Sequence, residues 1–569
     1  MSILLLYGSE TGTAQDIAES LRRESEMRHL PARVYELDEF DIENLQSETV
    51  VVFIVSTTGQ GEMPPNMRRS WRWLLRKSLR TDFLNDVNVA VLGLGDSSYQ
   101  KYNFAGKKLY RRLIQLGANM MTDIGLADDQ HELGIDGVFI QWKRRVWESI
   151  KALNVFNQMT LEIDTDVKIE PKYRFENCSE KSNFGDPQGD YCALRVESNN
   201  RVTAEEHFQD TRLVRFEIKP EDEHVFRYQA GDVMMVRPYN PQETVDIAIN
   251  ALGFSEELLN KPVRVIENNR FVKPPPYYLV NSVTTVKLCL QRYFDLQQVP
   301  KRSFFETLSY FSEDPTEKER LAELASPEGL DDLLDYANRS RRTTAEALRD
   351  FPVTAKALQP DQLFELFASI RPRAFSIASP PYAKAVELLV AKVEYSSRMS
   401  DKRRGLCSTF IARLIPGDEV FCKVRPGTFK FPDAHQPVIC VGPGTGVAPF
   451  RSLLLERNQH EDHSRHVLFF GCRSKEKDFY FEKEWKEAIG VEVVVAFSRD
   501  TDNKVYVQHM IGERARDVLN LLNEGASVFI AGSAGEMPKA VANVLKRLKG
   551  EEWVAKAEVS GKIQYETWS

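Results

Sequence analysis

Short apolar runs alternate with amphipathic stretches over the first 150 residues of the chain. The runs Ile3–Tyr7, Val50–Val55 and Val87–Leu92 have the length of buried strands. Ala14–Glu26 and Tyr102–Leu116 carry apolar residues at helical spacing. Strands that alternate with helices predict βαβ units and a parallel sheet, so we expect a doubly wound α/β domain here.

The pattern changes in the middle of the chain. Residues of about 165–200 are polar and rich in turn formers, which is typical of a linker. Beyond them, β-type sequence predicts an antiparallel barrel, with segments at Thr211–Ile218, Asp232–Val236, Ala385–Tyr395 and Glu419–Val424. The intervening block has a helical pattern, for example at Leu321–Ala337 and Ala345–Ala357, and we interpret it as an insertion into the barrel.

The alternation of strands and helices resumes near the C-terminus. The apolar runs there are Val438–Val441, His466–Phe470, Glu492–Phe497 and Ser527–Ala531. The predicted domains are a doubly wound domain at 1–150, a linker at 151–202, a barrel with an insertion of about 242–370 at 203–432, and a second doubly wound domain at 433–569.

Composition narrows the function classes. The chain has 569 residues, with 75 Lys and Arg against 83 Asp and Glu, so its formal net charge is −8. This mild acidity argues against a nucleic-acid-binding protein, which normally carries a basic stripe. With 42% hydrophobic and 28% charged residues the chain is an ordinary folded protein, and no apolar run approaches the roughly 20 residues of a membrane-spanning helix.

The N-terminus and the cysteines bear on the compartment. The N-terminus lacks a positive region and leads directly into an apolar run and a glycine, so we expect a first strand there, not a signal peptide. Seven cysteines without C-x-x-C and nine histidines without H-E-x-x-H favour neither a disulfide framework nor a metal site. We expect a reduced, cytoplasmic protein without a metal.

A loop of hydroxyls and glycine follows the first predicted strand and leads at once into a helix. It consists of Ser9, Glu10, Thr11, Gly12, Thr13 and Ala14. Donors at a helix N-terminus suit a phosphate, but the loop lacks the lysine of a nucleoside-triphosphate loop. A phosphate held in this way without a cation is typical of FMN in a flavodoxin; the alternative is an ordinary capped turn.

Two later loops follow the next two strands of this predicted sheet. The candidate FMN residues in and after them are Ser56, Thr57, Thr58, Gly59, Leu94, Gly95, Asp96, Ser97, Ser98, Tyr99, Gln100, Lys101, Tyr102 and Asn103. In a parallel sheet the carboxyl ends of neighbouring strands meet at one edge, where ligands bind. Tyr99 is suited to stack on a flat ring, and Asp128 and Asp129 would keep the rim acidic.

The last domain carries a second type of phosphate loop. Gly442–Phe450, which includes Thr445, follows an apolar strand, and its small residues would let a pyrophosphate approach the backbone. A further cluster follows Glu492–Phe497 and consists of Ser498, Arg499, Lys504, Val505, Tyr506, Val507 and Gln508. Its cations and hydroxyls favour a ribose 2′-phosphate, as in NADPH, over plain NAD; the alternative is a solvated charged loop.

Taken together, these motifs resemble the diflavin reductases over nearly the whole chain. The family joins a flavodoxin-like FMN domain to an FAD-binding barrel and a ferredoxin-reductase-like NADP domain, which implies FMN, FAD and NADPH as cofactors. Arg373, Ala374, Phe375 and Ser376 resemble its flavin motif, and Gly405, Leu406, Cys407 and Ser408 resemble its FAD-pyrophosphate loop. The resemblance also implies that Arg341 reaches the FAD phosphates and that the terminal aromatic Trp568 lies on the FAD ring.

The resemblance also implies roles in catalysis. Ser376 would hydrogen-bond near the flavin, Glu566 would be its polar neighbour, and Trp568 would be displaced by the nicotinamide. Three residues differ from those at the matching positions of microsomal relatives. Thr58 replaces an aromatic residue of the relatives, Ala531 replaces a cysteine and Glu566 replaces an aspartate. A cysteine-assisted hydride step therefore cannot be carried over.

Within the family, four stretches resemble the branch that supplies electrons to cytosolic iron–sulfur assembly. They are residues 57–61, 95–99, 128–134 and 371–376. This implies an iron–sulfur protein of anamorsin type as electron acceptor, with electrons passing from NADPH to FAD, to FMN and to the acceptor. A flavoprotein subunit of a sulfite-reductase-like system and a flavin-binding scaffold with little turnover are the alternatives.

Two further features bear on electron delivery. The polar linker would let the FMN domain move between FAD and the acceptor. A basic run is expected to be a solvated helix face, although it could steer an acidic partner; it consists of Arg68, Arg69, Arg72, Arg76, Lys77 and Arg80.

Overall fold

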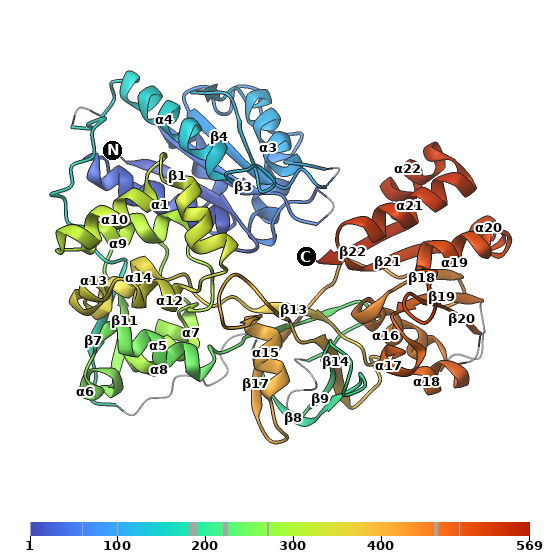
Figure 1. Cartoon of the computed structure of the whole chain (residues 1–569). Coiled ribbons are helices and arrows are strands. Elements are labelled where there is room, and N and C mark those ends of the chain that lie inside the picture. Colours follow the sequence, from blue (N-terminus) through green and yellow to red (C-terminus); the bar gives the residue numbers. More distant parts are fainter. Residues whose placement is uncertain are drawn as a thin grey trace. The chain divides into compact units, whose positions relative to one another are not determined.

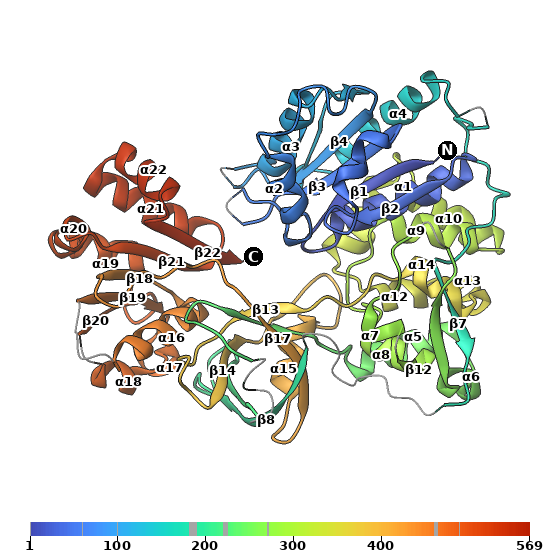
Figure 2. The ribbon, with the colours of Figure 1, turned by 180° about the vertical axis from the view of Figure 1, so that it is seen from behind.

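The chain folds into two compact units (Figures 1 and 2). The computed structural model describes residues 2–59, 61–99, 101–156, 158–180, 191–219, 223, 226–269, 272–280, 282–459, 465–488 and 490–568. The first unit comprises residues 1–185, 240–369 and 397–401, and the second comprises 186–239, 370–396 and 402–569. In the described part of the chain, no helix has both the length and the apolar character needed to cross a membrane.

The first unit begins with a parallel sheet in the strand order β2-β1-β3-β4-β5, with β6 paired to β4. Its strands are β1 (Ile3–Gly8), β2 (Ala32–Glu36), β3 (Val50–Ser56), β4 (Asn88–Gly95), β5 (Asn119–Met120) and β6 (Gly125–Asp128). The helices are α1 (Thr13–Met27), α2 (Arg68–Leu74), α3 (Phe104–Gln115) and α4 (Asp136–Ala152). This is the doubly wound, flavodoxin-like arrangement that the sequence predicted.

The sheet is buried on both faces because successive side chains of a strand point to opposite sides. Leu5 packs in the same cluster as Trp142 of α4, whereas Leu4 and Leu6 pack in the cluster that contains Leu109 of α3. The central strands therefore read as continuous apolar runs, and this made them recognisable.

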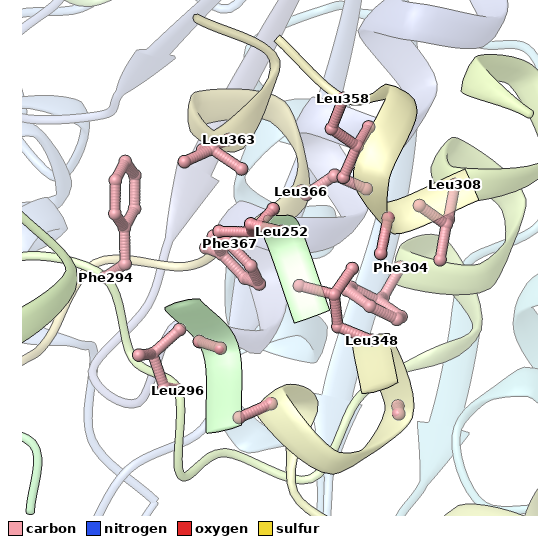
Figure 3. Close-up of a cluster of buried hydrophobic side chains, with 14 of the residues drawn as sticks. Leu252, Phe294, Leu296, Phe304, Leu308, Leu348, Leu358, Leu363, Leu366 and Phe367 are labelled. Atoms are coloured by element: carbon pink, nitrogen blue, oxygen red, sulfur yellow. The ribbon is translucent and has the colours of Figure 1, made fainter. Parts of the chain in front are cut away.

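The insertion completes the first unit. Its helices are α5 (Gln242–Leu252), α6 (Glu256–Asn260), α7 (Tyr277–Val280), α8 (Val286–Arg292), α9 (Arg302–Phe311), α10 (Pro315–Ala325), α11 (Leu330–Leu333), α12 (Thr344–Arg349), α13 (Pro352–Ala357) and α14 (Leu363–Leu366). They surround a core to which Leu252, Phe304 and Phe367 contribute (Figure 3). A small sheet, β12-β11-β7, lies beside them, with β7 (Tyr173–Asn177), β11 (Val263–Glu267) and β12 (Val283–Thr284).

Two predicted helices of the insertion are interrupted. The helix expected at 321–337 ends at Ala325, because Ser326 and Pro327 follow, and the backbone oxygen of Glu323 leaves no room for a side chain at Gly329. The helix expected at 345–357 is split before Pro352 into α12 and α13. Continuous helices were therefore wrong at both places.

The second unit starts with a six-stranded antiparallel sheet in the order β13-β10-β17-β8-β9-β14. Its strands are β8 (Cys192–Arg201), β9 (Thr211–Glu217), β10 (Val233–Val236), β13 (Arg373–Ser376), β14 (Ala385–Ala391) and β17 (Glu419–Arg425). A bridge between Ile377 and Leu388 joins the two ends of this order. Beside it lie β15 (Glu394–Tyr395), β16 (Arg403–Arg404) and α15 (Leu406–Arg413).

The range predicted as a linker, 151–202, includes residues in regular elements. Its first two residues end α4, β7 pairs with β11 of the insertion, and β8 belongs to the six-stranded sheet. The turn-rich residues 181–190 lie outside the described residues. Polar composition did not distinguish strands with one exposed face from a linker.

A second parallel sheet, in the order β20-β19-β18-β21-β22, completes this unit. Its strands are β18 (Val438–Val441), β19 (His466–Cys472), β20 (Val491–Phe497), β21 (Ser527–Ser533) and β22 (Ile563–Trp568). The helices are α16 (Ala448–Arg457), α17 (Lys475–Asp478), α18 (Glu482–Glu487), α19 (Val507–Glu513), α20 (Ala515–Asn523), α21 (Glu536–Lys549) and α22 (Glu551–Val559). The sequence did not predict β22, the edge strand that ends the described chain.

Candidate cofactor-binding and electron-transfer sites

The first predicted phosphate loop lies at the N-terminus of α1. Gly12 adopts φ 100° there and donates its backbone N–H to Ser9 Oγ at 2.9 Å. Ser9 in turn donates its N–H to Asn66 Oδ1 at 2.9 Å, so Asn66 fixes the loop although the sequence did not single it out. A 15-residue helix with hydroxyls at its start fits a phosphate monoester.

The structure brings the other two predicted FMN loops to the same sheet edge, because β1, β3 and β4 are parallel neighbours. Thr57 links them: its N–H donates to Leu94 O at 2.9 Å, and its hydroxyl accepts the N–H of Ala105 at 3.2 Å. Asp128 Oδ1 accepts the N–H of Ser97 at 2.9 Å. Hydroxyls, backbone amides and a half-buried Tyr99 thus lie along one rim, which suits FMN.

Several predicted FMN residues support the rim. Asn103 is buried with φ 55°, and its side-chain amide donates to Ala127 O at 2.9 Å. Tyr102 donates its hydroxyl to Leu126 O at 2.8 Å, and Lys101 packs against Gly61. Gln100 lies outside the described residues.

Acidic and basic neighbours have opposite effects on the Asp129 carboxyl at this rim. Burial raises the pKa of the Asp129 carboxyl, and the neighbouring Asp96 and Asp128 add to this rise. Arg341 and Lys301 act in the opposite direction, and both belong to the insertion. Arg341, expected at the FAD phosphates, lies in the first unit with φ 54°, whereas the other predicted FAD residues lie in the second.

The predicted FAD-pyrophosphate loop lies at the N-terminus of α15. Gly405 donates its N–H to Val393 O at 3.0 Å, and the Ser408 hydroxyl accepts the N–H of Val393 at 3.1 Å. A Cβ on Gly405 would lie 2.7 Å from Ser408 Oγ. Leu406 and Cys407 are buried, and burial raises the pKa of the Cys407 thiol to about 12, so it remains a neutral core group.

The flavin motif forms strand β13. Arg373, Ala374, Phe375 and Ser376 pair with β10, and Phe375 packs against the core of the six-stranded sheet. Ser376 donates its hydroxyl to Glu566 Oε1 at 2.6 Å. The structure therefore joins two of the residues predicted to be catalytic, although 190 positions separate them in the sequence.

Glu566 carries the unusual electrostatics of this site. Its second carboxylate oxygen, Oε2, is buried and has no hydrogen-bond partner among the described residues. Burial raises the pKa of the carboxyl, and the hydrogen bond from Ser376, the backbone N–H of Thr428 and the charge of Arg425 together oppose that rise only in part. Trp568, 37% exposed, lies two residues further along β22 and therefore on the same face of the strand. An orphaned buried oxygen beside an exposed aromatic fits a bound flavin and nicotinamide.

The glycine loop after β18 fits a pyrophosphate. Gly444 adopts φ 58°, and Thr445 lies half-buried in the turn that leads into α16. A Cβ on Gly446 would lie 2.3 Å from Ala531 O, so no side chain fits there. The backbone of the loop thus packs directly on β21, as a dinucleotide loop requires.

The predicted 2′-phosphate cluster gathers after β20. The backbone N–H groups of Ser498 and Arg499 donate to Cys472 O and Arg473 O, at 2.9 and 2.8 Å. The pKa of Tyr506 is lowered first by its hydrogen bond to Arg499, with further contributions from the charges of Lys504 and Arg473. An electropositive site with a phenol fits a phosphate dianion.

The remaining members of this cluster support the loop and the helix that follows it. Val507 is buried in the core, Val505 packs against it, and Gln508 lies in the first turn of α19. These positions hold the loop and helix that carry the polar side chains.

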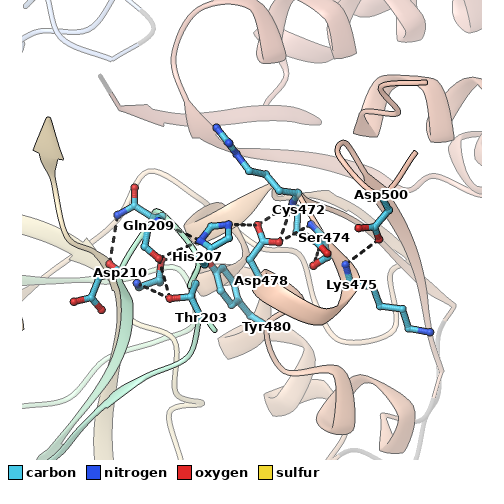
Figure 4. Close-up of polar contacts among 12 residues, drawn as sticks. Thr203, His207, Gln209, Asp210, Cys472, Ser474, Lys475, Asp478, Tyr480 and Asp500 are labelled. Carbon is cyan, nitrogen blue, oxygen red and sulfur yellow. Dashed lines mark hydrogen bonds and ion pairs between the residues drawn. The ribbon is translucent and has the colours of Figure 1, made fainter. Parts of the chain in front are cut away.

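Arg473 is a member of this cluster that sequence reasoning missed. Asp478 accepts the N–H groups of Arg473 and Ser474, with distances of 2.8 and 2.7 Å, and so fixes the turn after β19 (Figure 4). The signal was available, because Arg473 follows an apolar run whose carboxyl end lies beside that of β20.

Comparison with known proteins identifies the assembly of these sites. Residues 5–142 match the Flavodoxin family, 187–410 the FAD binding domain family and 440–543 the Oxidoreductase NAD-binding domain family. Three relatives named NADPH-dependent diflavin oxidoreductase 1 match 100% of this chain and 99% of their own length. They come from Danio rerio (40% identical over 600 residues), Bos taurus (39% over 606) and Arabidopsis thaliana (36% over 631). The chain belongs to the NADPH-dependent diflavin oxidoreductase family.

Membership confirms the predicted fold class, the enzyme class and the cofactors FMN, FAD and NADPH. When bound, the two flavins would supply the chemistry that couples a two-electron donor to a one-electron acceptor. In this diflavin oxidoreductase, Ser376 and Glu566 form a partly buried polar pair, and Glu566 Oε2 can carry a proton.

The raised pKa of Glu566 predicts a pH-dependent effect on stability. A carboxyl whose pKa rises on folding contributes stability below its ordinary value of 4.5, and this contribution is lost as the pH rises through the raised value. Glu566→Gln removes the ionisation but can still accept a hydrogen bond from Ser376. We therefore expect the melting temperature of this variant to rise relative to that of the unmodified oxidoreductase between pH 5 and pH 8.

Thermal unfolding across this pH range measures the effect. Glu552→Gln is the matched control, because the side chain of Glu552 is 83% exposed on α22 and should show no pH-dependent difference. A difference between Glu566→Gln and the unmodified oxidoreductase that stays constant with pH would contradict the assignment.

Proposed function

We propose that this diflavin oxidoreductase delivers single electrons from NADPH to an iron–sulfur protein of anamorsin type in cytoplasmic iron–sulfur cluster assembly. The observation that carries the proposal is similarity over the full length to relatives named NADPH-dependent diflavin oxidoreductase 1, in a chain that matches flavodoxin, FAD-binding and NAD-binding families. Two flavins in series are needed where a two-electron donor meets a one-electron acceptor, and an iron–sulfur cluster takes one electron at a time. The four stretches that resemble the iron–sulfur branch add support.

The roles of individual residues form part of the proposal. Ser9–Ala14, Ser56–Gly59 and the rim from Leu94 to Asn103, with Asp129, would bind FMN. Arg341 and the two motifs at 373–376 and 405–408 would bind FAD. Thr445 and the cluster at 498–508 would bind NADPH, with Trp568 covering the flavin until nicotinamide displaces it. We place the boundaries of the domains at the residues expected from the sequence: 1–150, 151–202, 203–432 and 433–569.

The basic run offers a surface for an acidic acceptor. Arg69, Arg72 and Lys77 are exposed on and just after α2, on the flavodoxin-like domain. Cations on such a surface raise association rates with an acidic protein and make them sensitive to salt. These residues support a protein acceptor that docks on the FMN domain.

The proposal is tested with the purified holoenzyme, NADPH and an iron–sulfur protein of anamorsin type. We expect rapid, saturable reduction of the cluster. In the variant in which Arg69, Arg72 and Lys77 are all replaced by Gln, we expect a severalfold higher KM for the acceptor and a weaker dependence on salt, while flavin reduction by NADPH is unchanged. Arg144→Gln, with a 76% exposed side chain on α4, is the matched control.

Three outcomes would contradict the proposal. Reduction of a sulfite reductase haemoprotein but not of the iron–sulfur protein would favour the sulfite-reductase-like alternative. Bound flavin that NADPH does not reduce would favour the docking scaffold. If Arg144→Gln raised the KM for the acceptor as much as the triple replacement does, the basic run would not be the docking surface.

A further inference from the structure

The insertion reaches the candidate FMN phosphate loop with a lysine. Lys301 precedes α9, and its ammonium donates to the Thr13 hydroxyl at 3.5 Å. The same ammonium lies 4.0 Å from Asp16 Oδ2, in the first turn of α1. Lys301 and Thr13 are 288 positions apart in the sequence, and both belong to the first unit. The fold therefore supplies a cation to a loop that the sequence predicted to work without one.

The loop itself is electrostatically unfavourable for a phosphate. Residues 9–16 contain Glu10 and Asp16 but neither lysine nor arginine. A phosphate monoester carries a charge of about −1.5 to −2 near pH 7, so two carboxylates beside it repel it. Two residues of the insertion compensate the negative charge of Asp16. Ser303 donates its hydroxyl to Asp16 Oδ1 at 2.7 Å, and the Lys301 ammonium lies near Asp16 Oδ2.

A second lysine of the insertion provides a comparison. Lys273 is engaged by two carboxylates, at 3.2 Å from Glu36 Oε1 and 2.6 Å from Glu39 Oε1, as expected for a structural ion pair. Lys301 instead makes a long hydrogen bond to a hydroxyl and a long ion pair, and its side chain is 30% exposed. An ammonium has three donors, so Lys301 retains the capacity to bind an anion at the loop.

We propose that Lys301 is part of the FMN phosphate site and that the insertion thereby contributes to FMN binding. The inference rests on the proposed assignment of Ser9–Ala14 to FMN. Because coupling between two binding events is reciprocal, FMN also strengthens the packing of the flavodoxin-like domain on the insertion.

The inference is tested by titrating FMN and riboflavin into the full chain from which FMN has been removed, with flavin fluorescence as the readout. We expect Lys301→Ala to weaken FMN binding about 5- to 20-fold, as for the loss of one charge-assisted contact at a partly exposed site. Riboflavin, which lacks the phosphate, should bind the variant as it binds the unmodified chain, and this also shows that the variant is folded. Lys301→Arg should restore FMN binding to within about threefold.

Lys273→Ala is the matched control, since it removes another lysine of the insertion that pairs with the flavodoxin-like domain, at Glu36 and Glu39, and leaves the loop intact. The inference is overturned if Lys301→Ala leaves FMN binding unchanged, if riboflavin binding falls equally, or if Lys273→Ala has the same effect. If the unmodified chain binds riboflavin and FMN equally, or neither, the assignment of the phosphate loop itself fails. This outcome is distinct from FMN binding that does not depend on Lys301.

Discussion

Replacing Glu365 by alanine is expected to lower the free energy of unfolding of the first unit by about 3–5 kcal/mol. Glu365 lies in α14 of the insertion and accepts Arg22 Nη2 at 2.7 Å and Arg23 Nη1 at 3.2 Å, both from α1. The side chains of Arg22 and Glu365 are fully buried. The other carboxylate oxygen accepts the N–H of Lys172 at 2.8 Å. The truncation would thus leave two guanidinium groups without their shared counterion.

The electrostatics of the neighbouring carboxyl add a pH dependence to this contact. Burial alone would raise the pKa of Glu19, but the Lys172 ammonium, Arg23 and the hydrogen bond from Gln15 together outweigh it, and the pKa is lowered to about 2. A carboxyl with a lowered pKa contributes stability above its ordinary value of 4.5, and this is lost as the pH falls towards 2. We therefore expect the first unit to lose stability on acidification below pH 4.5.

Urea unfolding of the FMN-loaded chain, followed by flavin fluorescence, measures both effects. Glu148→Ala is the control, because its ion pair with Arg144 is exposed and should be worth less than about 1 kcal/mol. The double variant Arg22→Met, Glu365→Leu should recover part of the loss, since it removes the charges of Arg22 and Glu365 together and leaves only Arg23 without this counterion. A change of less than about 1 kcal/mol for Glu365→Ala would contradict this interpretation of the contact.

The second large effect concerns the choice of nucleotide. Arg499→Ala is expected to lower kcat/KM for NADPH about 100-fold and to leave kcat/KM for NADH nearly unchanged. The Arg499 guanidinium donates to Ser498 O at 2.6 Å, and together with Lys504 and Arg473 it lowers the pKa of Tyr506 in the electropositive cluster after β20. Hydrogen bonds to charged groups contribute about 1.5–3 kcal/mol, and 1.4 kcal/mol corresponds to a factor of 10. Only NADPH carries the 2′-phosphate that this cluster fits.

Steady-state reduction of cytochrome c with each nucleotide measures this preference. Arg514→Ala is the control, because Arg514 lies in the same domain but pairs with Glu492 and Asp517. If the ratio of kcat/KM for NADPH to kcat/KM for NADH were unchanged in Arg499→Ala, Arg499 would not belong to the 2′-phosphate site.

The pattern of apolar residues along the chain was sufficient to predict the strands that are buried on both faces of their sheet. The central strands of both parallel sheets are continuous apolar runs, and parallel order brings their carboxyl ends to one edge. The phosphate loops could thus be placed before their contacts were known. The interrupted helices at Pro327 and Pro352 show the limit of periodicity where a breaker follows a helical stretch.

The charged contacts between distant segments could not be predicted. Arg22 on α1 and Glu365 on α14 lie 343 positions apart, and a charged residue on an amphipathic helix is normally solvated. The contacts of Lys301 with Thr13 and of Glu566 with Ser376 also join residues that are far apart in the sequence. In each case the partner is brought in by tertiary packing, which spacing along one element does not reveal.

Conversion of the electron pair of NADPH into single electrons requires two flavins in one chain. Anaerobic visible spectroscopy of the purified holoenzyme tests it most directly, with the flavin content determined after release. We expect one FMN and one FAD per chain, bleaching of both on addition of NADPH, and return of both absorbances when a one-electron acceptor is added. One flavin per chain, or an FMN absorbance that NADPH leaves unchanged while FAD bleaches, would contradict it.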